Sequence, residues 1–303
     1  MSLIISRRRM IAAGGATLVA PAIMSTARRA EAQGSQLTVS GRSLNSISAS
    51  DDGFYSAVET LYPGLLVDPG FQKIARLALL ITHRQGQAVR AFSVSWRVTL
   101  SGGTTEIGMY YYSSLGSPAT GHISTALGSA RRNMIYPGQS RLATPFFSWT
   151  PDDYQRNPKP DWQNLPYTEP ASFLVSSLSS ASEIKVSLDA VGFSDWKMIG
   201  PDRHNLGGKL RARRNAEHDE ALVAYRLLKR GASDSAIVEK LKSDGSVPRS
   251  SKTDENVRWY ENARRFHAQF LLNAFLSSDR ATFVDALTRL KLRRRTTITR
   301  LAS

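Results

Sequence analysis

The chain has 303 residues, 40 basic and 25 acidic side chains and no cysteine, which gives a formal net charge of +15. This length allows one large domain or two ordinary domains with a substantial core. The lack of cysteine excludes disulfides, thiolate metal sites, a cysteine nucleophile and a lipidated N-terminal cysteine.

Residues 1–32 have the pattern of a bacterial export signal. Arg7 and Arg8 precede a mildly apolar stretch, residues 12–24, and Ala30 and Ala32 form a small-x-small motif after it. This pattern resembles a twin-arginine (Tat) signal peptide. The resemblance implies export of the folded protein by the Tat translocase, cleavage after Ala32, and a periplasmic or secreted location in a bacterium. The alternative is an uncleaved basic tail. The apolar stretch is too short for a spanning helix, and no later stretch is long enough, so no transmembrane helix is expected in the mature chain.

Residues 33–202 predict a β-sandwich domain built around one strong pattern. Residues 77–81 are apolar at every position, which predicts a strand covered on both faces. Residues 89–100 alternate, which predicts a half-buried strand with Trp96 in the core. The glycine-containing loop 83–87 between them predicts a hairpin at the centre of a sheet. We expect Trp96 to pack near Leu79, Ile81 and Val94.

Other strands and short helices complete this domain. Many short strands separated by turns are typical of an all-β, immunoglobulin-like sandwich, here without a disulfide. The acid pairs Asp51-Asp52 and Asp152-Asp153 are interpreted as parts of helix starts, where acids suit the helix dipole, and not as catalytic pairs. Further strands are predicted at residues 37–39, 106–112, 140–149, 172–178 and 183–193.

Three consecutive tyrosines, Tyr110 to Tyr112, end one predicted strand. Because successive side chains of a strand point to opposite faces, at least one of them should be exposed. They are interpreted either as ordinary strand packing or as a platform for stacking a sugar or a base.

Residues 203–303 predict an α-helical domain, so the whole chain is assigned to the α+β class. Helical periodicity and helix start and stop signals place helices at residues 209–229, 233–242, 254–276 and 279–292. Thr253 is the expected cap of the third helix. The remaining tail, residues 293–303, is expected to add a strand or to remain loose.

Without residues 1–32, the excess positive charge of the chain is confined to the helical half. Residues 33–202 contain 13 basic and 13 acidic side chains, whereas residues 203–303 contain 22 basic and 11 acidic side chains. This asymmetry favours an anionic partner, either an anionic envelope component or an acidic protein. The export signal argues against nucleic acid, and the alternative is a solvated basic surface. The candidate binding residues are Arg211, Arg213, Arg214, Arg293, Arg294 and Arg295.

No sequence motif of an enzyme or a cofactor site is present. HExxH, GxSxG, a phosphate-binding loop and GxGxxG after a strand are all absent. The side chains of the acidic cluster Glu217 to Glu220 point to different faces of one helix, so they are not expected to bind one metal ion. With the motifs above absent, no metal, catalytic or cofactor-binding residue and no cofactor is predicted. The favoured function is a non-enzymatic envelope or secreted protein that binds an anionic partner or has a structural role. The alternative is an exported hydrolase of an envelope polysaccharide, with carboxylates spread over loops and with Tyr110 to Tyr112 and Trp162 as a sugar platform.

Overall fold

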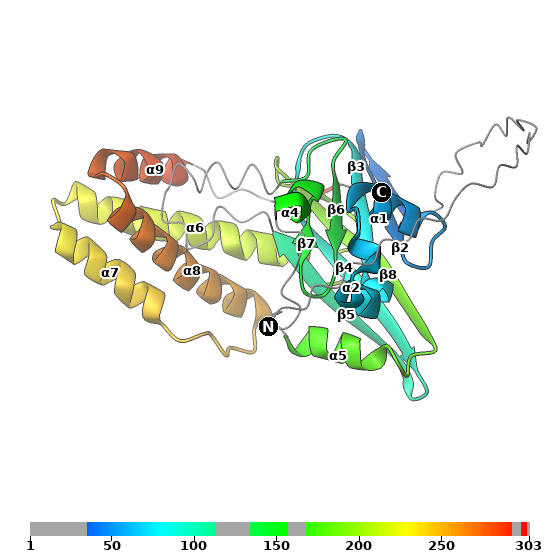
Figure 1. Ribbon diagram of the computed structural model, residues 1–303. Helices are drawn as coiled ribbons and strands as arrows, with labels where there is room; N and C mark the ends of the chain where they lie inside the picture. The colour runs from blue at the N-terminus through cyan, green and yellow to red at the C-terminus, as the bar shows by residue number, and fades with distance from the viewer. Residues whose placement is uncertain (1–34, 113–133, 157–167, 293–297, 302–303) are drawn as a thin grey trace, which may run out of the picture. The chain divides into compact units, whose positions relative to one another are not determined.

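The computed structural model describes residues 35–112, 134–156, 168–292 and 298–301, which belong to one compact unit. Two β-sheets come first in the chain and four long helices follow, which confirms the α+β class (Figure 1). Within the described residues, no helix has the length and apolar character needed to cross a membrane. The predicted signal residues Arg7, Arg8, Ala30 and Ala32 lie outside the described residues, as do Trp162 and residues 293–295.

The first sheet is antiparallel, with the strand order β1-β2-β3-β6-β7. One of its faces is covered by α1 and α2, whose side chains Phe54, Val58 and Phe71 pack with Leu80 and Leu142 of the sheet. The elements are β1 (Ser35–Val39), β2 (Arg42–Ser48), α1 (Phe54–Leu61), η1 (Leu65–Val67), α2 (Pro69–Ile74), η2 (Ala75–Leu77), β3 (Leu79–Gln85), β6 (Ser140–Ala143) and β7 (Ser148–Trp149).

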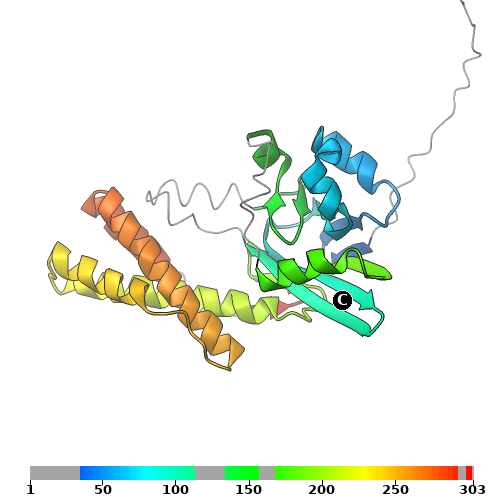
Figure 2. The same cartoon turned by 60° about the horizontal axis from the view of Figure 1, so that its bottom comes forward.

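The second sheet has the order β10-β9-β8-β4-β5, with β5 at one end. All its pairs are antiparallel except the pair of β10 with β9. Helix α5 (Glu169–Ser177) lies against β4 (Figure 2). The strands are β4 (Val89–Leu100), β5 (Gly103–Tyr112), β8 (Glu183–Phe193), β9 (Lys197–Ile199) and β10 (Thr299–Arg300).

Trp96 lies in a core that both sheets share. Its side chain is 0% exposed, and its indole nitrogen donates a hydrogen bond of 2.9 Å to the carbonyl oxygen of Leu77. Leu79, Ile81 and Val94 belong to the same buried cluster. The predicted core position of Trp96 is therefore confirmed.

The predicted hairpin of β3 and β4 is wrong, because the two strands belong to different sheets. Strand β3 pairs with β2 and β6, so neither edge is left for β4. The connecting turn is fixed by the buried ring of His83, which contacts the carbonyl oxygens of Ser43 (3.3 Å) and Gln87 (2.9 Å). The prediction that both faces of this apolar strand are covered holds, since Leu79 and Leu80 enter two different cores.

The strand predicted at residues 172–178 is wrong, because residues 172–177 belong to helix α5 and Leu178 is its C-cap. Thr168 caps this helix by accepting a hydrogen bond from the backbone N–H of Ala171, and Pro170 stands in the first turn. Ala171 and Leu174 are buried three residues apart, which is a helical spacing. The start of α4 (Pro151–Arg156) was predicted correctly.

The sequence predicted that Asp51 lies at the start of a helix, and this prediction is wrong. Asp51 accepts hydrogen bonds from the backbone N–H (2.6 Å) and the hydroxyl (2.7 Å) of Ser48. Helix α1 starts at Phe54, after Gly53, whose φ of 81° suits a glycine.

Four helices form the C-terminal half, as predicted. Helix α6 packs against α8 and α9, and α7 packs against α8. Buried side chains from all four, including Ala224, Leu241, Leu271 and Phe283, form one cluster. Asp254, and not Thr253, caps α8. The helices are α6 (Leu206–Lys229), α7 (Asp234–Ser246), α8 (Glu255–Ser277) and α9 (Arg280–Leu292).

Candidate functional site

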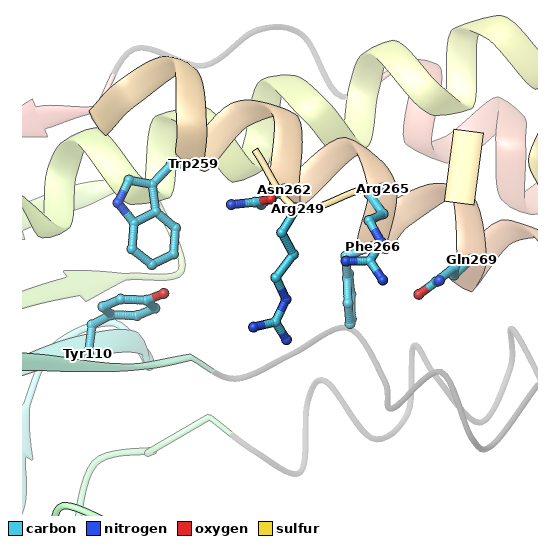
Figure 3. A pocket seen from close by; sticks show the side chains of 7 residues that line it. All are labelled: Tyr110, Arg249, Trp259, Asn262, Arg265, Phe266 and Gln269. Carbon is cyan, nitrogen blue, oxygen red and sulfur yellow. The ribbon is translucent and has the colours of Figure 1, made fainter. Parts of the chain in front are cut away.

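A groove of about 450 Å³ lies between the second sheet and the helices (Figure 3). We call it the β5–α8 groove, because β5 supplies one of its lining residues and α8 supplies most of the others. Its described lining combines three aromatic rings, two guanidinium groups and two amides, and none of these described residues is acidic. The lining residues are Tyr110, Arg249, Trp259, Asn262, Arg265, Phe266 and Gln269.

One face of α8 builds the floor of the groove. Trp259, Asn262, Phe266 and Gln269 follow one another at spacings of three, four and three residues, which places them on one side of a helix. At 1.5 Å per residue this stripe is about 15 Å long. A different face of α8, which includes Leu271, is buried in the helical core. The groove is thus a second, partly exposed face of a helix whose position the core fixes.

An aromatic corner closes one end of the groove. The rings of Tyr110 and Trp259 meet edge to face, with their centroids 4.7 Å apart. The ammonium of Lys209 lies over both rings, 4.8 Å from the first centroid and 5.2 Å from the second. The indole N–H of Trp259 donates a hydrogen bond of 3.1 Å to Glu255. These contacts fix both rings before any ligand arrives.

Burial shifts the pKa values of the polar groups around this corner. Burial raises the pKa of Tyr110 to about 12, against a smaller opposing effect of Arg213. Burial lowers the pKa of Lys209, although the carboxylate of Glu255, 3.7 Å away, opposes this shift. For Glu255 itself, burial is outweighed by the hydrogen bond from Trp259 and other contacts, so its pKa is lowered.

A smaller hollow of about 190 Å³ adjoins the groove and shares four of its lining residues. Lys209, Arg213 and Ala263 complete its lining. The guanidinium of Arg213 lies over the ring of Phe266, 5.0 Å from its centroid. Helix α6 therefore adds two cations to the aromatic side of the site.

The connection between α7 and α8 forms the other wall. The backbone carbonyl of Gly245 accepts hydrogen bonds from Arg265 (3.3 Å) and Gln269 (2.8 Å), and Asn262 accepts one from the backbone N–H of Ser250 (2.9 Å). A Cβ on Gly245 would lie 2.7 Å from the side chain of Gln269, so only glycine allows this close approach. These contacts hold the loop that carries Arg249 against α8.

The helices and the second sheet are joined by the buried carboxylate of Asp189, which is 0% exposed. It accepts hydrogen bonds from the hydroxyl of Ser93 (3.1 Å) and from the backbone N–H groups of Arg203 (3.1 Å) and His204 (3.2 Å). A Cβ on Gly108 would lie only 2.0 Å from the ring of His204, so β5 and the start of α6 are in close contact. This junction sets the position of Tyr110 relative to the helices.

The three predicted binding arginines that the structure describes lie in three different environments. Arg213 lines the smaller hollow, and Arg211 is exposed on α6. Arg214 is only 3% exposed and pairs with Glu217 at 2.8 Å, so it is not part of an exposed basic surface. The other three, residues 293–295, lie outside the described residues.

Most of the groove was missed by the sequence analysis. The sequence placed Trp259 and Phe266 in the predicted helix 254–276 without giving them a role, whereas they line the groove. The sequence does contain one signal for the groove, which is a stripe of aromatic and amide residues on one side of the predicted helix. Its members are Trp259, Asn262, Phe266 and Gln269. Tyr110, which belongs to the predicted tyrosine platform, is the sheet's contribution to the site.

The acidic cluster of α6 is divided among separate partners. Glu217 pairs with Arg214, and Glu220 pairs with Arg264. Asp219 accepts a hydrogen bond of 2.7 Å from Tyr260. Within the part of the chain that the structure describes, no group of three or more His, Cys, Asp or Glu side chains is arranged to hold a metal ion.

A separate hollow of about 770 Å³ lies beside α4. Its lining includes Tyr136, Gln139, Asp152 and Gln155. Asp152 is the one carboxylate among its described lining residues. The pair of facing carboxylates that the hydrolase alternative requires is therefore not formed by these residues.

Comparison with known proteins adds no relative. No family model, no curated protein and no solved structure gives a significant match to this chain. The functional argument consequently depends on the chemistry of the β5–α8 groove.

Proposed function

We propose that the protein is a non-enzymatic binding protein that docks an anionic partner in the β5–α8 groove. The main support is the lining, in which Arg249 and Arg265 stand beside aromatic rings and no other described lining residue is charged. A guanidinium is planar and weakly hydrated, so it pairs with a carboxylate or a phosphate through two parallel hydrogen bonds. Apolar rings next to such a pair exclude water and strengthen the attraction.

The charge of the helical half supports the same proposal. Its net charge is +11 from 22 basic and 11 acidic side chains, against zero for residues 33–202. Such a field attracts anions from beyond contact distance and accelerates encounter, within a range of about 10 Å at ordinary salt. The groove then supplies the short-range contacts.

We further propose that the protein works outside the cytoplasm. The support is the resemblance of residues 1–32 to a Tat signal, which implies the Tat translocase as the export partner. The positive charge of the helical half then favours an anionic envelope component or an acidic protein as the binding partner. The two sheets with their shared core would serve as an immunoglobulin-like sandwich that carries the helical module. The predicted location is periplasmic or secreted.

Retention of the purified protein on polyanions tests the binding function. The probes are immobilised polyglutamate, immobilised polygalacturonate and vesicles of phosphatidylglycerol, each with a neutral counterpart, at low and high salt. We expect retention on at least one polyanion, with release by salt. A variant with Arg293, Arg294 and Arg295 replaced by Gln measures the contribution of the tail. Passage of the wild type through all three at low salt would refute the proposed function.

A further inference from the structure

We infer that the occupant of the β5–α8 groove is a short acidic peptide segment of a partner protein, with one aromatic anchor side chain. This inference rests on the proposed binding function and specifies its partner. It is drawn from the residue types of the groove, from polar atoms in it that have no hydrogen-bond partner among the described residues, and from its length.

The residue types are those that dominate the binding energy of protein–protein interfaces. Trp, Tyr and Arg are the most enriched in such energetic centres, whereas Lys, Glu, Asp, Ser and Ala are depleted at interfaces. The groove has Trp259, Tyr110, Arg249 and Arg265 in its lining, together with Phe266, and its described lining residues include none of the depleted types. Tyr110 and Trp259 already pack edge to face against each other. An aromatic anchor side chain of the partner would therefore pack on the neighbouring ring of Phe266.

Two amides provide the polar contacts that a peptide backbone needs. The Oδ1 atom of Asn262 is used by Ser250, and its Nδ2 donor makes no hydrogen bond within the described residues. The Nε2 atom of Gln269 is used by Gly245, and its Oε1 acceptor likewise has no described partner. A donor and an acceptor about 10 Å apart along α8 match the alternating C=O and N–H groups of an extended chain. A polyphosphate, which only accepts hydrogen bonds, would leave the acceptor of Gln269 unused.

Charge and length define the segment further. Among the described lining residues no acidic side chain accompanies Arg249 and Arg265, so the complementary occupant carries Asp or Glu on both sides of its anchor. In Figure 3 the side chain of Arg249 lies between the Tyr110–Trp259 pair and the ring of Phe266. The stripe of about 15 Å accommodates about five residues of extended peptide. A flat membrane surface would not reach residues on the floor of a groove.

Binding of labelled peptides to the full-length mature protein tests the inference. The probes are a peptide of Asp and Glu with one central Phe, the same peptide with Ser in place of Phe, and a charge-reversed peptide of Lys with the central Phe. Fluorescence anisotropy is expected to show about tenfold tighter binding of the Phe peptide than of the Ser peptide, and no measurable binding of the charge-reversed one. Equal binding of the Phe and Ser peptides would overturn the inference.

Two groove variants and one control variant locate the binding. Arg249→Gln is expected to weaken the Phe peptide about fivefold, because this exposed loop residue contributes one charge-assisted contact and no described structural contact. Arg230→Gln is the matched control, because Arg230 is exposed at the opposite end of α6, about 30 Å along the helix from Lys209. This control variant should change the affinity less than twofold. Phe266→Leu is expected to remove most of the difference in affinity between the Phe peptide and the Ser peptide, because the ring of Phe266 and the Phe anchor of the peptide are expected to be energetically coupled. Equal effects of Arg249→Gln and Arg230→Gln would overturn the inference.

Polygalacturonate oligomers and phosphatidylglycerol vesicles are included in the same assay. Tighter binding of either than of the acidic peptides, with loss in Arg249→Gln, would refute the peptide inference and leave the proposed anion-binding function in place. Absence of binding to every anionic probe would refute both.

Discussion

Replacement of Trp96 by Ala should remove a large part of the stability of the protein. The side chain is 0% exposed in the core shared by both sheets, and truncation of such a residue costs roughly 3–5 kcal/mol in the free energy of unfolding. The change also leaves the carbonyl of Leu77 without its indole donor, which places the cost toward the upper end of this range. The conservative change Trp96→Phe keeps most of the apolar contact and should cost about 1–3 kcal/mol.

Urea unfolding followed by far-ultraviolet circular dichroism measures these differences. Leu276→Ala is the control, because this leucine is 64% exposed and its loss should change stability by less than about 0.5 kcal/mol. If Trp96→Ala does not fold, Trp96→Phe still provides a graded value. A cost for both Trp96 variants no larger than that of the control would refute the assignment of Trp96 to the shared core.

Three other predictions concern export, a buried ion pair and pH. Replacing Arg7 and Arg8 by Lys should leave the precursor in the cytoplasm, and export at normal yield in cell fractionation would contradict the Tat assignment. Arg214→Ala should cost about 3–5 kcal/mol in thermal or urea unfolding because it removes a buried guanidinium from its ion pair with the buried carboxylate of Glu217. The exposed Arg211→Ala should cost less than about 0.5 kcal/mol, and equal costs would refute the importance of this pair. Burial lowers the pKa of His267 to about 4, so the unfolded chain binds a proton that the folded protein does not, and stability falls as the pH drops from about 6.5 toward 4. His267→Leu should remove this loss of about 3 kcal/mol, and a wild-type-minus-variant difference that ignores pH would refute it.

The local patterns of the chain predicted individual elements better than their pairing. The strand pattern of residues 89–100 and the helical periodicity of the C-terminal half depend on nearby residues, and the strand and the four helices are present. Their details differ from the prediction: Ser93 and Ser95 of the strand are buried, and Asp254 replaces Thr253 as the cap of α8. The pairing of β3 depends on β2 and β6, which lie far away in the sequence, and the short loop after His83 suits a hairpin and a crossing between sheets equally well. The strand β2 was missed because its sequence is mostly polar, although the fold buries nearly all of it.

The binding site shows the same limit at the level of side chains. Arg213 and Arg214 are neighbours in a basic run, yet one lines a hollow and the other is buried in an ion pair. Their different fates follow from the 100° rotation between successive helical residues and from which neighbouring helix each side meets. The meeting of Tyr110 with Trp259 joins residues about 150 positions apart, and no local pattern encodes such a contact.

The affinity of groove variants for polyglutamate tests the central claim most directly. The double variant Arg249→Gln/Arg265→Gln removes two cations from the β5–α8 groove, and Lys229→Gln/Arg230→Gln removes two exposed cations from the far end of α6. Both variants lose the same charge, so any difference between them reports the position of the binding site. We predict that the groove variant loses about tenfold in affinity at low salt and the control about twofold or less. Equal losses in the two variants would contradict the assignment of the groove as the docking site for the anionic partner.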